Sequence, residues 1–444
     1  MEERNEITEG VIWKQILLYF FPILIGYLFQ QLYNTVDTII VGKYVSSAAL
    51  AAVGGTGTLI NLLVGFFIGL SSGATVIIAQ YYGAKNVNEL NKAVHTGIAL
   101  AIAGGIILTL IGLFFSPWAL HMINIPDDIF DTSLLYIRIY FLGMISSMIY
   151  NVGAGILRAI GDSKSPRNYL IITCLVNIVL DIFFVLLLHL DVAGVAIATV
   201  LSQSISAILT LRKLIITSDI YKLTLSKIRF HIHILKDIMR IGLPAGGQSV
   251  LYSISNLIIQ SCVNGFGTNT IAAWTSFGKI DAIVWFVMNA FGTSILTFVG
   301  QNYGAKKIDR VKKTIRVGLL MNFITIAFVQ TLIYFFRDPL LSLFTNDAEV
   351  IEIGSSILKQ LAPFYVGFVF NEVLSAAIKG SGEGFMPMII TVFSICLFRL
   401  LWILLVIPHT SGILWVSLSY AITWCLSSFV FILYYIYYRK KKFC

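Results

Sequence analysis

The sequence predicts an all-α polytopic membrane protein with twelve transmembrane helices in two six-helix lobes. Composition, long apolar runs and an internal repeat together support this prediction. The chain has 444 residues, of which 57% are hydrophobic and only 12% charged, and its mean hydropathy is +0.86. A soluble domain carries roughly 25% charged residues, so this supply is too small to cover a water-facing surface.

Uncharged apolar runs recur along almost the whole chain. A helix needs about 20 apolar residues to cross the hydrocarbon core, and only helices and closed barrels satisfy their backbone in lipid. The runs are far longer than the roughly 10-residue strands of a membrane barrel. We therefore expect helical spans at about residues 15–41, 48–80, 95–116, 132–157, 167–188, 192–212, 238–264, 270–301, 317–336, 350–378, 387–408 and 412–437.

The basic residues gather in alternate loops, as they do on the cytoplasmic side of membrane proteins. The opposite side keeps only Lys43 and Arg337, beside acids such as Asp127 and Asp128. We therefore expect both termini to be cytoplasmic, in a multi-pass protein of the inner (plasma) membrane, with no secretory signal peptide. The net charge of +9 is then an orientation signal and does not indicate nucleic acid.

The two halves of the chain share three landmarks at a nearly constant offset. The segment 80–85 (QYYGAK) recurs at 301–306 (QNYGAK), and 158–162 (RAIGD) recurs at 379–383 (KGSGE), while Pro22 corresponds to Pro244. Six spans per half preserve orientation, which is typical of transporters with two repeats. The predicted domains are a first lobe at 1–212, a cytoplasmic amphipathic connector at 213–237 lying on the inner membrane surface, and a second lobe at 238–444.

Polar oxygen groups in the first half form a candidate cation site. Asp37 lies in the first span, while Asn177 and Asp181 share one face of the fifth span because they are four residues apart. Asp181 and Thr199 of the sixth span both lie roughly 12–13 Å from the outer ends of their helices at 1.5 Å per residue, and Asp37 is also in the outer half. These hard oxygen ligands are suited to bind Na⁺ or to carry a proton. A static interhelical hydrogen-bond network is the alternative.

The second half has no counterpart of this site. Ile258 or Ile259 stands where the repeat would place Asp37, and Trp402 stands for Asp181. This half has a different charge cluster instead, made of Lys279, Asp281, Glu372 and Arg399. Because intramembrane charges normally find partners, we expect Glu372 to pair with Arg399 or Lys279, either as a structural pair or as a second coupling site.

A further set of residues is a candidate for contact with the substrate. Aromatic and amide side chains predicted to face the cleft are candidates for substrate contact, with simple packing as the alternative: Gln30, Gln31, Tyr33, Tyr150 and Asn151. No HExxH, GxSxG or Walker-type motif occurs, so we expect neither an enzyme nor a resident cofactor.

These features together resemble the multidrug and toxic compound extrusion (MATE) family over essentially the full length. The resemblance rests on the two QxYGAK segments, the loop 161–166 (GDSKSP), Asp37 and the Asn177–Asp181 spacing. It implies a V-shaped pair of six-helix lobes and a cation site in the first lobe at Asp37, Asn177, Asp181 and Thr199. Some branches of the family use a Glu in the seventh span, where Tyr252 stands in this chain.

The resemblance also implies a function. We expect a secondary active multidrug efflux antiporter that works by alternating access. It would export small organic and often cationic compounds in exchange for Na⁺ or H⁺. Its partners would be these substrates and membrane lipid, and we expect it to act as a monomer. The alternative is a lipid-linked oligosaccharide or lipid flippase of the same superfamily, in which several basic residues line the cavity.

Overall fold

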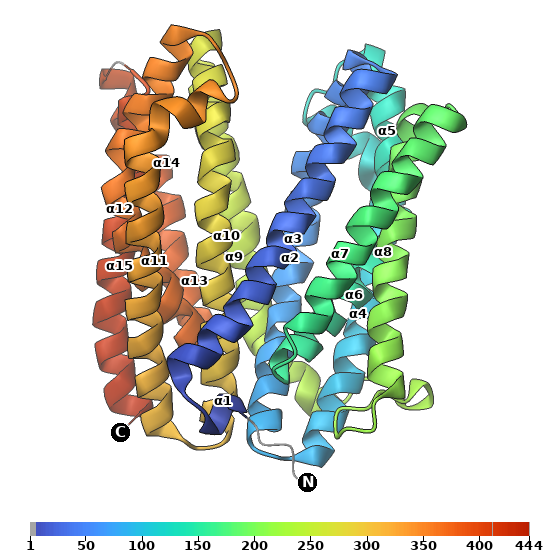
Figure 1. Cartoon of the computed structure of the whole chain (residues 1–444), viewed down its shortest axis with the longest axis vertical. Helices are drawn as coiled ribbons and strands as arrows, with labels where there is room; N and C mark the ends of the chain where they lie inside the picture. The colour runs from blue at the N-terminus through green and yellow to red at the C-terminus, as the bar shows by residue number, and fades with distance from the viewer. Residues whose placement is uncertain (1–5, 411, 444) are drawn as a thin grey trace. The chain divides into compact units, whose positions relative to one another are not determined.

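The computed structural model describes residues 6–410 and 412–443, and every regular element within these ranges is a helix. The first half contains α1 (Glu6–Glu9), α2 (Ile12–Ile40), α3 (Ser47–Gly83), α4 (Val87–Met122), α5 (Asp127–Leu142), α6 (Met144–Ala159), α7 (Lys164–Asp181) and α8 (Asp191–Ile216). The second contains α9 (Ile232–Asn264), α10 (Thr268–Gly304), α11 (Ile308–Ser342), α12 (Ala348–Gly380), α13 (Phe385–Thr391), α14 (Phe398–Leu405) and α15 (Leu414–Lys442) (Figure 1).

Each of the twelve predicted spans coincides with helix in the structure. The fourth span is the pair α5 and α6, bent by 47° at Gly143, and the eleventh combines α13 and α14 through a π-helical segment. Ten segments are long and apolar enough to cross a membrane, and the bent pair adds an eleventh. The twelfth is α9, which has the length at 33 residues but carries polar side chains such as Gln248, Asn256 and Gln260 along it.

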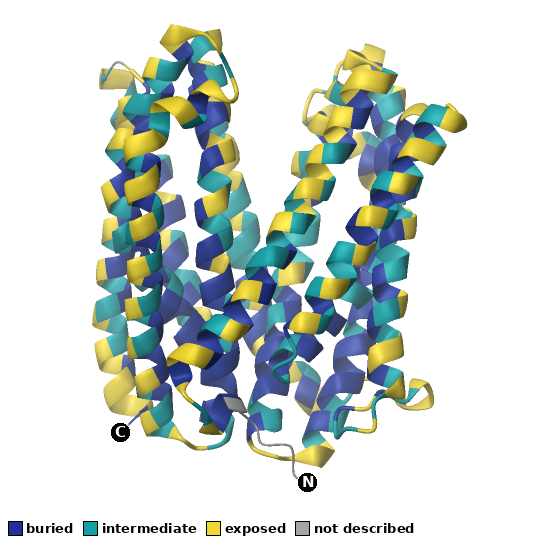
Figure 2. Ribbon diagram, viewed as in Figure 1, coloured by how far each residue is buried: buried dark blue, intermediate teal, exposed yellow. Residues whose placement is uncertain are grey.

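Many large apolar side chains are exposed, and exposed residues, yellow in Figure 2, recur along the helices. Phe114 is 73% exposed, Trp118 64% and Phe335 72%. Exposed apolar area on this scale is rare on soluble monomers. A lipid environment accounts for it, because these side chains then face acyl chains instead of water.

The repeated sequence motifs form the same turns in both halves. Lys85 and Lys306 each end a helix in the left-handed region, with φ of 54° and 57°. In each turn one amide reaches back five residues, from Asn86 to the Tyr81 carbonyl (3.1 Å) and from Lys307 to the Asn302 carbonyl (2.9 Å). This is the Schellman pattern of helix termination. The QxYGAK repeat therefore encodes a chain reversal.

The second repeated loop also follows one plan. Gly161 and Gly382 have φ of 103° and 99°, a region open to glycine without steric cost. The acidic residue after each glycine then accepts amide hydrogen bonds from the start of the next helix, at 2.9 Å from Ser165 to Asp162 and 3.1 Å from Phe385 to Glu383. The Gly-Asp-Ser sequence at 161–163 is thus a turn.

The chain folds into two compact units whose boundaries differ from the predicted lobes. The N-terminal unit comprises residues 21–246, and the C-terminal unit comprises the described residues up to Phe20 together with those from Gly247 onward. The first turns of α2 belong to the C-terminal unit because Phe20 stacks on Phe291 at 4.3 Å and the Tyr19 hydroxyl donates to Thr297 at 3.2 Å. The start of α9 belongs to the N-terminal unit because it crosses α3 closely at Gly69 and Gly73.

The segment predicted as an amphipathic connector, 213–237, joins α8 to α9. Helix α8 continues to Ile216, the chain is then mostly irregular, and α9 begins at Ile232. The segment packs on its own unit: Leu223 is buried, its amide donates to the Leu214 carbonyl at 2.8 Å, and the Thr224 amide donates to His95 Nε2 at 3.0 Å. These backbone bonds tie the segment to α8 and to His95 of α4.

Candidate functional site

The N-terminal unit brings together the four residues of the predicted cation site. Asp37 comes from α2, Asn177 and Asp181 come from one face of α7, and Thr199 comes from α8. All four are buried, and Asp37, the most accessible, is 8% exposed. The Thr199 hydroxyl lies 3.5 Å from Asp37 Oδ2, and the carboxyl groups of Asp37 and Asp181 are neighbours.

The polar atoms of this cluster are largely without protein partners. Asp37 Oδ1, both carboxyl oxygens of Asp181 and both side-chain polar atoms of Asn177 are buried and form no hydrogen bond within the described chain. Buried polar groups in proteins are normally bonded, so four oxygens without a donor mark a site built to accept. Two neighbouring carboxylates also repel each other when both are ionised. A bound cation or a proton relieves both conditions.

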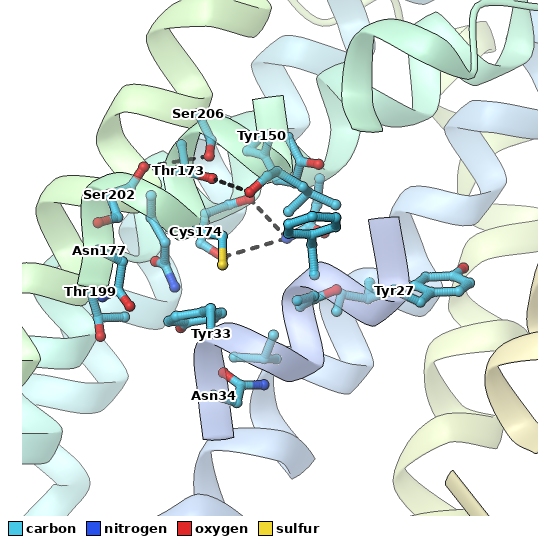
Figure 3. Close-up of a pocket in the computed structure, with 18 of the residues that line it drawn as sticks. Tyr27, Tyr33, Asn34, Tyr150, Thr173, Cys174, Asn177, Thr199, Ser202 and Ser206 are labelled. Atoms are coloured by element: carbon cyan, nitrogen blue, oxygen red, sulfur yellow. Dashed lines mark hydrogen bonds between the residues drawn. The ribbon is translucent and has the colours of Figure 1, made fainter. Parts of the chain in front are cut away.

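A cavity of about 360 Å³ lies next to this cluster, inside the N-terminal unit. Asn177 and Thr199 belong to both, since they line the cavity as well as joining the carboxylates. Figure 3 shows their side chains converging with Tyr33 and Asn34 of α2 on one space. The ion cluster and the cavity therefore share a wall.

Four of the five predicted contact residues line this cavity: Gln30, Tyr33, Tyr150 and Asn151. Gln31 is not among the residues that line it. The cavity is also lined by five residues that were not predicted from the sequence: Tyr27, Asn34, Asn61, Tyr140 and Gln203. Helical spacing gives a signal for two of these, because Tyr27, Gln30 and Asn34 follow the i, i+3, i+7 pattern of one face.

The cavity wall is dominated by tyrosines, amides and hydroxyls. Arg158, at the end of α6, is the one formally charged residue among those that line it. The sequence placed Arg158 in a surface loop, whereas the structure places it where its charge acts on Tyr150. The charged group acting on Asp37 is Asp181, so Arg158 does not serve as the counter-ion of the carboxylates.

The C-terminal unit contains a second polar cluster with different chemistry. Asp281 of α10 accepts hydrogen bonds from Trp285 Nε1 at 2.9 Å and from the Tyr365 hydroxyl. Arg399 of α14 is fully buried, donates through Nε to Thr423 at 3.3 Å and stacks 3.8 Å from the Tyr420 ring. Its two terminal nitrogens have no hydrogen-bond partner within the described chain. Here the carboxylate is hydrogen-bonded, whereas the two terminal nitrogens of the cation are not.

The predicted pairing of Glu372 is not what the structure shows. Among the ion pairs of the described residues none includes Glu372, and Lys279 is exposed. The cation acting on Glu372 is Lys379, two turns along the same helix, whose Nζ donates to Gln248 Oε1 at 2.9 Å. The sequence could not reveal this, because the pairing depends on how α12 is rotated against α9 and α10.

Comparison with known proteins identifies the family. The MatE family model matches residues 22–183 and 244–405, two segments of equal length that together cover most of the chain. This chain belongs to the MatE family. The double match confirms the internal repeat, and membership confirms that the MatE protein is a membrane transporter and not an enzyme.

Several curated relatives match along most of their length. The chain is 30% identical to "Probable multidrug resistance protein YoeA" of Bacillus subtilis over 391 residues, covering 86% of this chain and 84% of the relative. It is 27% identical to "Probable multidrug resistance protein NorM" of Thermotoga maritima over 404 residues, covering 89% and 86%. A "FAD transporter" of Shewanella oneidensis is 24% identical over 392 residues, covering 85% of each chain.

Solved structures agree on the fold. A crystal structure of MATE in the bent conformation is 25% identical and matches with a TM-score of 0.91, covering 98% of this chain and 97% of that one. An outward-facing multidrug resistance MATE family transporter matches at 0.90, with the same identity and coverage. These matches confirm the predicted all-helical membrane fold.

Proposed function

We propose that this MatE family protein exports small organic compounds, often cationic ones, in exchange for Na⁺ or H⁺ by alternating access. The observation that carries the proposal is the shared wall between the buried carboxylate cluster and the 360 Å³ cavity. The names of relatives such as YoeA and NorM, which refer to multidrug resistance, support the direction and the substrate class.

Coupling would arise at the residues common to both sites. An ion held by Asp37 and Asp181 draws on the oxygens of Asn177 and Thr199, which also border the cavity. Binding of the ion and binding of the substrate then influence each other, and such coupling is reciprocal by necessity. Ion entry from outside releases the substrate, and the loaded protein turns inward. One inward charge contributes about 2.3 kcal/mol per 100 mV.

The cavity wall suits planar organic molecules. Four tyrosines, Tyr27, Tyr33, Tyr140 and Tyr150, offer ring faces on which a cation can rest, and the amides offer both donors and acceptors. The transporter then needs no resident cofactor, since the coupling ion is itself cargo. A flippase for pyrophosphate-linked lipids would place several cations in the cavity, whereas among the described residues Arg158 is the one charged residue that lines it.

Transport into sealed vesicles tests the proposal. The purified protein is reconstituted into sealed vesicles, so that molecules with the cytoplasmic side outward can take up ethidium. Uptake is measured while a sodium gradient and a pH gradient are imposed separately. We expect one gradient to drive uptake, and Asp37→Asn and Asp181→Asn each to abolish it. Asp131→Asn, at an exposed position on α5, serves as the control of equal chemistry and should transport normally.

Two results would overturn the proposal. Uptake that neither gradient drives would remove the coupling mechanism. Uptake that persists unchanged in Asp37→Asn would remove the role of the cluster. Translocation of a fluorescent lipid-linked oligosaccharide by the same vesicles, without ethidium transport, would favour the flippase.

A further inference from the structure

A second cavity, of about 440 Å³, lies in the N-terminal unit between the start of α7 and the end of α8. It shares no lining residue with the 360 Å³ cavity or with the cation cluster. Two cations, Arg212 and Lys213, and three hydroxyl groups, on Tyr169, Thr217 and Ser218, line it. Its wall is therefore rich in hydrogen-bond donors.

The two cations are not neutralised by the protein. Neither Arg212 nor Lys213 takes part in an ion pair among the described residues. One acid close to this cavity is Asp162, which like Arg212 acts on Tyr169. Asp162 is already engaged, since its Oδ1 accepts the Ser165 amide at 2.9 Å and its Oδ2 accepts the Ser165 hydroxyl at 2.5 Å.

A second acid, Asp219, is held in the same manner by its own turn. Its Oδ1 accepts the Ile220 amide at 2.6 Å, and its amide donates to Thr217 Oγ1 at 3.2 Å. The two cations therefore remain available to an acceptor from outside the protein. A phosphate group fits this donor set, because it offers a negative charge and several oxygens to an arginine and a lysine.

Apolar side chains continue from this cavity along both helices. Ile208, 62% exposed, lies one turn deeper than Arg212 on α8, and Ile172 lies one turn deeper than Tyr169 on α7. Ile216 and Leu175 are exposed as well. Inorganic phosphate would make no contact with these apolar side chains, whereas the acyl chains of a phospholipid would cover them.

The position of the cavity is that of a lipid headgroup. It lies at the end of two membrane-spanning helices, next to the basic connector, and the distribution of Lys and Arg predicts that this end faces the cytoplasm. Basic pockets between membrane helices on that side are typical binding places for anionic lipid headgroups.

We propose that this cavity binds the phosphate of an anionic phospholipid of the cytoplasmic leaflet, with the acyl chains lying along Ile208, Ile172 and Leu175. The lipid bridges α7 and α8, which carry Asn177, Asp181 and Thr199 of the cation cluster. It acts from outside the transport path and does not depend on the exporter being driven by Na⁺ or H⁺.

Lipid binding to the purified full-length protein in detergent tests the proposal. Phosphatidylglycerol or phosphatidylcholine is added at equal concentration, and native mass spectrometry counts the bound lipid while a thermal melt reports stabilisation. We expect phosphatidylglycerol to be retained preferentially, and Arg212→Gln combined with Lys213→Gln to weaken retention by roughly thirtyfold, since each of the two cations near an anionic lipid contributes about 1 kcal/mol.

Matched variants separate a site from general attraction. Lys440→Gln combined with Lys441→Gln removes the same charge from the end of α15 and should retain phosphatidylglycerol normally. Arg212→Lys combined with Lys213→Arg keeps both charges and should retain most of the binding, which shows whether a loss in the glutamine variant comes from misfolding. Ile208→Gln should weaken lipid retention without changing the response to inorganic phosphate.

Three outcomes would overturn the proposal. Equal loss in the α15 control would show diffuse electrostatic attraction. Stabilisation by inorganic phosphate as strong as that by phosphatidylglycerol, lost in the Arg212/Lys213 glutamine variant, would show a site for free phosphate. Unchanged retention in that variant would place the lipid elsewhere.

Discussion

At the scale of single residues, Asp37 shows how burial and hydrogen bonding define the candidate ion site. One of its oxygens faces the Thr199 hydroxyl at 3.5 Å, and the other has no partner within the described chain. Because helical rise is nearly constant, the sequence predicted a similar depth in the membrane for Asp37, Asn177, Asp181 and Thr199. It could not place Gln31 or Arg158, because their directions depend on helix rotation and on where α6 ends.

Removal of the Thr199 hydroxyl should weaken ion coupling without abolishing transport. Thr199→Val keeps the shape and deletes one oxygen of the cluster, and a hydrogen bond to a charged group contributes about 1.5 kcal/mol. We expect the ion concentration for half-maximal efflux to rise roughly tenfold. Thr199→Ser should restore it. Thr38→Val is the control, because the Thr38 hydroxyl is exposed and bonds its own helix at Asn34; an equal effect there would contradict the assignment.

Arg399 should be energetically coupled to Asp281. Arg399 is buried and Asp281 is partly buried in the C-terminal unit. The guanidinium lacks partners at its terminal nitrogens, and its charge acts on the Asp281 carboxyl group. A buried charge left alone is costly, by about 2.5–3.5 kcal/mol on insertion scales. We expect Arg399→Gln and Asp281→Asn each to lower the melting temperature. The double variant should lose less than the sum of the two single losses. Additive losses in a double-mutant cycle would show that the two charges act independently.

At the scale of elements, the repeated turns explain why the sequence repeat is visible at all. The sequence predicted that the QxYGAK segments are equivalent, and the structure adds the reason, which is a left-handed residue after the last helical turn. A β-branched residue is strained in that conformation. Lys85→Ile should therefore lower the free energy of unfolding by about 1 kcal/mol, whereas Lys85→Gly should raise it slightly.

Lys164→Ile provides the control for the loss of charge at Lys85. Lys164 lies in the first turn of α7 with no ion pair among the described residues. Both measurements use thermal unfolding in detergent. If Lys85→Ile and Lys164→Ile lose the same stability, the left-handed conformation is not the cause.

The crossing of α3 and α9 depends on glycine at close approach. A Cβ at Gly69 would lie 2.6 Å from the Gly246 backbone, and a Cβ at Gly73 would lie 2.7 Å from the Gly242 nitrogen. Backbone cannot yield as a side-chain tip can, so Gly73→Ala should separate the helices and lower stability by about 1–3 kcal/mol. Gly57→Ala on the same helix meets nothing within 4 Å and should be neutral or stabilising by up to about 1 kcal/mol. A loss at Gly57 equal to that at Gly73 would contradict this account.

At the scale of the whole molecule, the positions of the helical spans along the chain followed from the sequence, whereas the division into units did not. Apolar runs of sufficient length specify spans locally. The assignment of the first turns of α2 to the C-terminal unit rests on Tyr19 and Phe20 meeting Thr297 and Phe291, almost 280 positions away. No local pattern reports such a contact. The same limit applies to the segment 213–237, because its composition does not report the backbone bonds that it forms to α8 and to His95 of α4.

The orientation of the whole molecule is a prediction that labelling can test. Because most basic residues lie at one end of the helices, that end should face the cytoplasm. In a cysteine-free background, Lys222→Cys in the connector should react with a membrane-impermeant maleimide only after the cells are permeabilised. Asp131→Cys lies near the start of α5, on the side of the membrane predicted to face outward, and should react in intact cells. Both positions are exposed, so they differ only in the side of the membrane on which they lie. The reverse pattern would mean that the charge bias does not orient this chain, and it would move the proposed lipid site to the outer leaflet, where a different set of headgroups would meet Arg212 and Lys213.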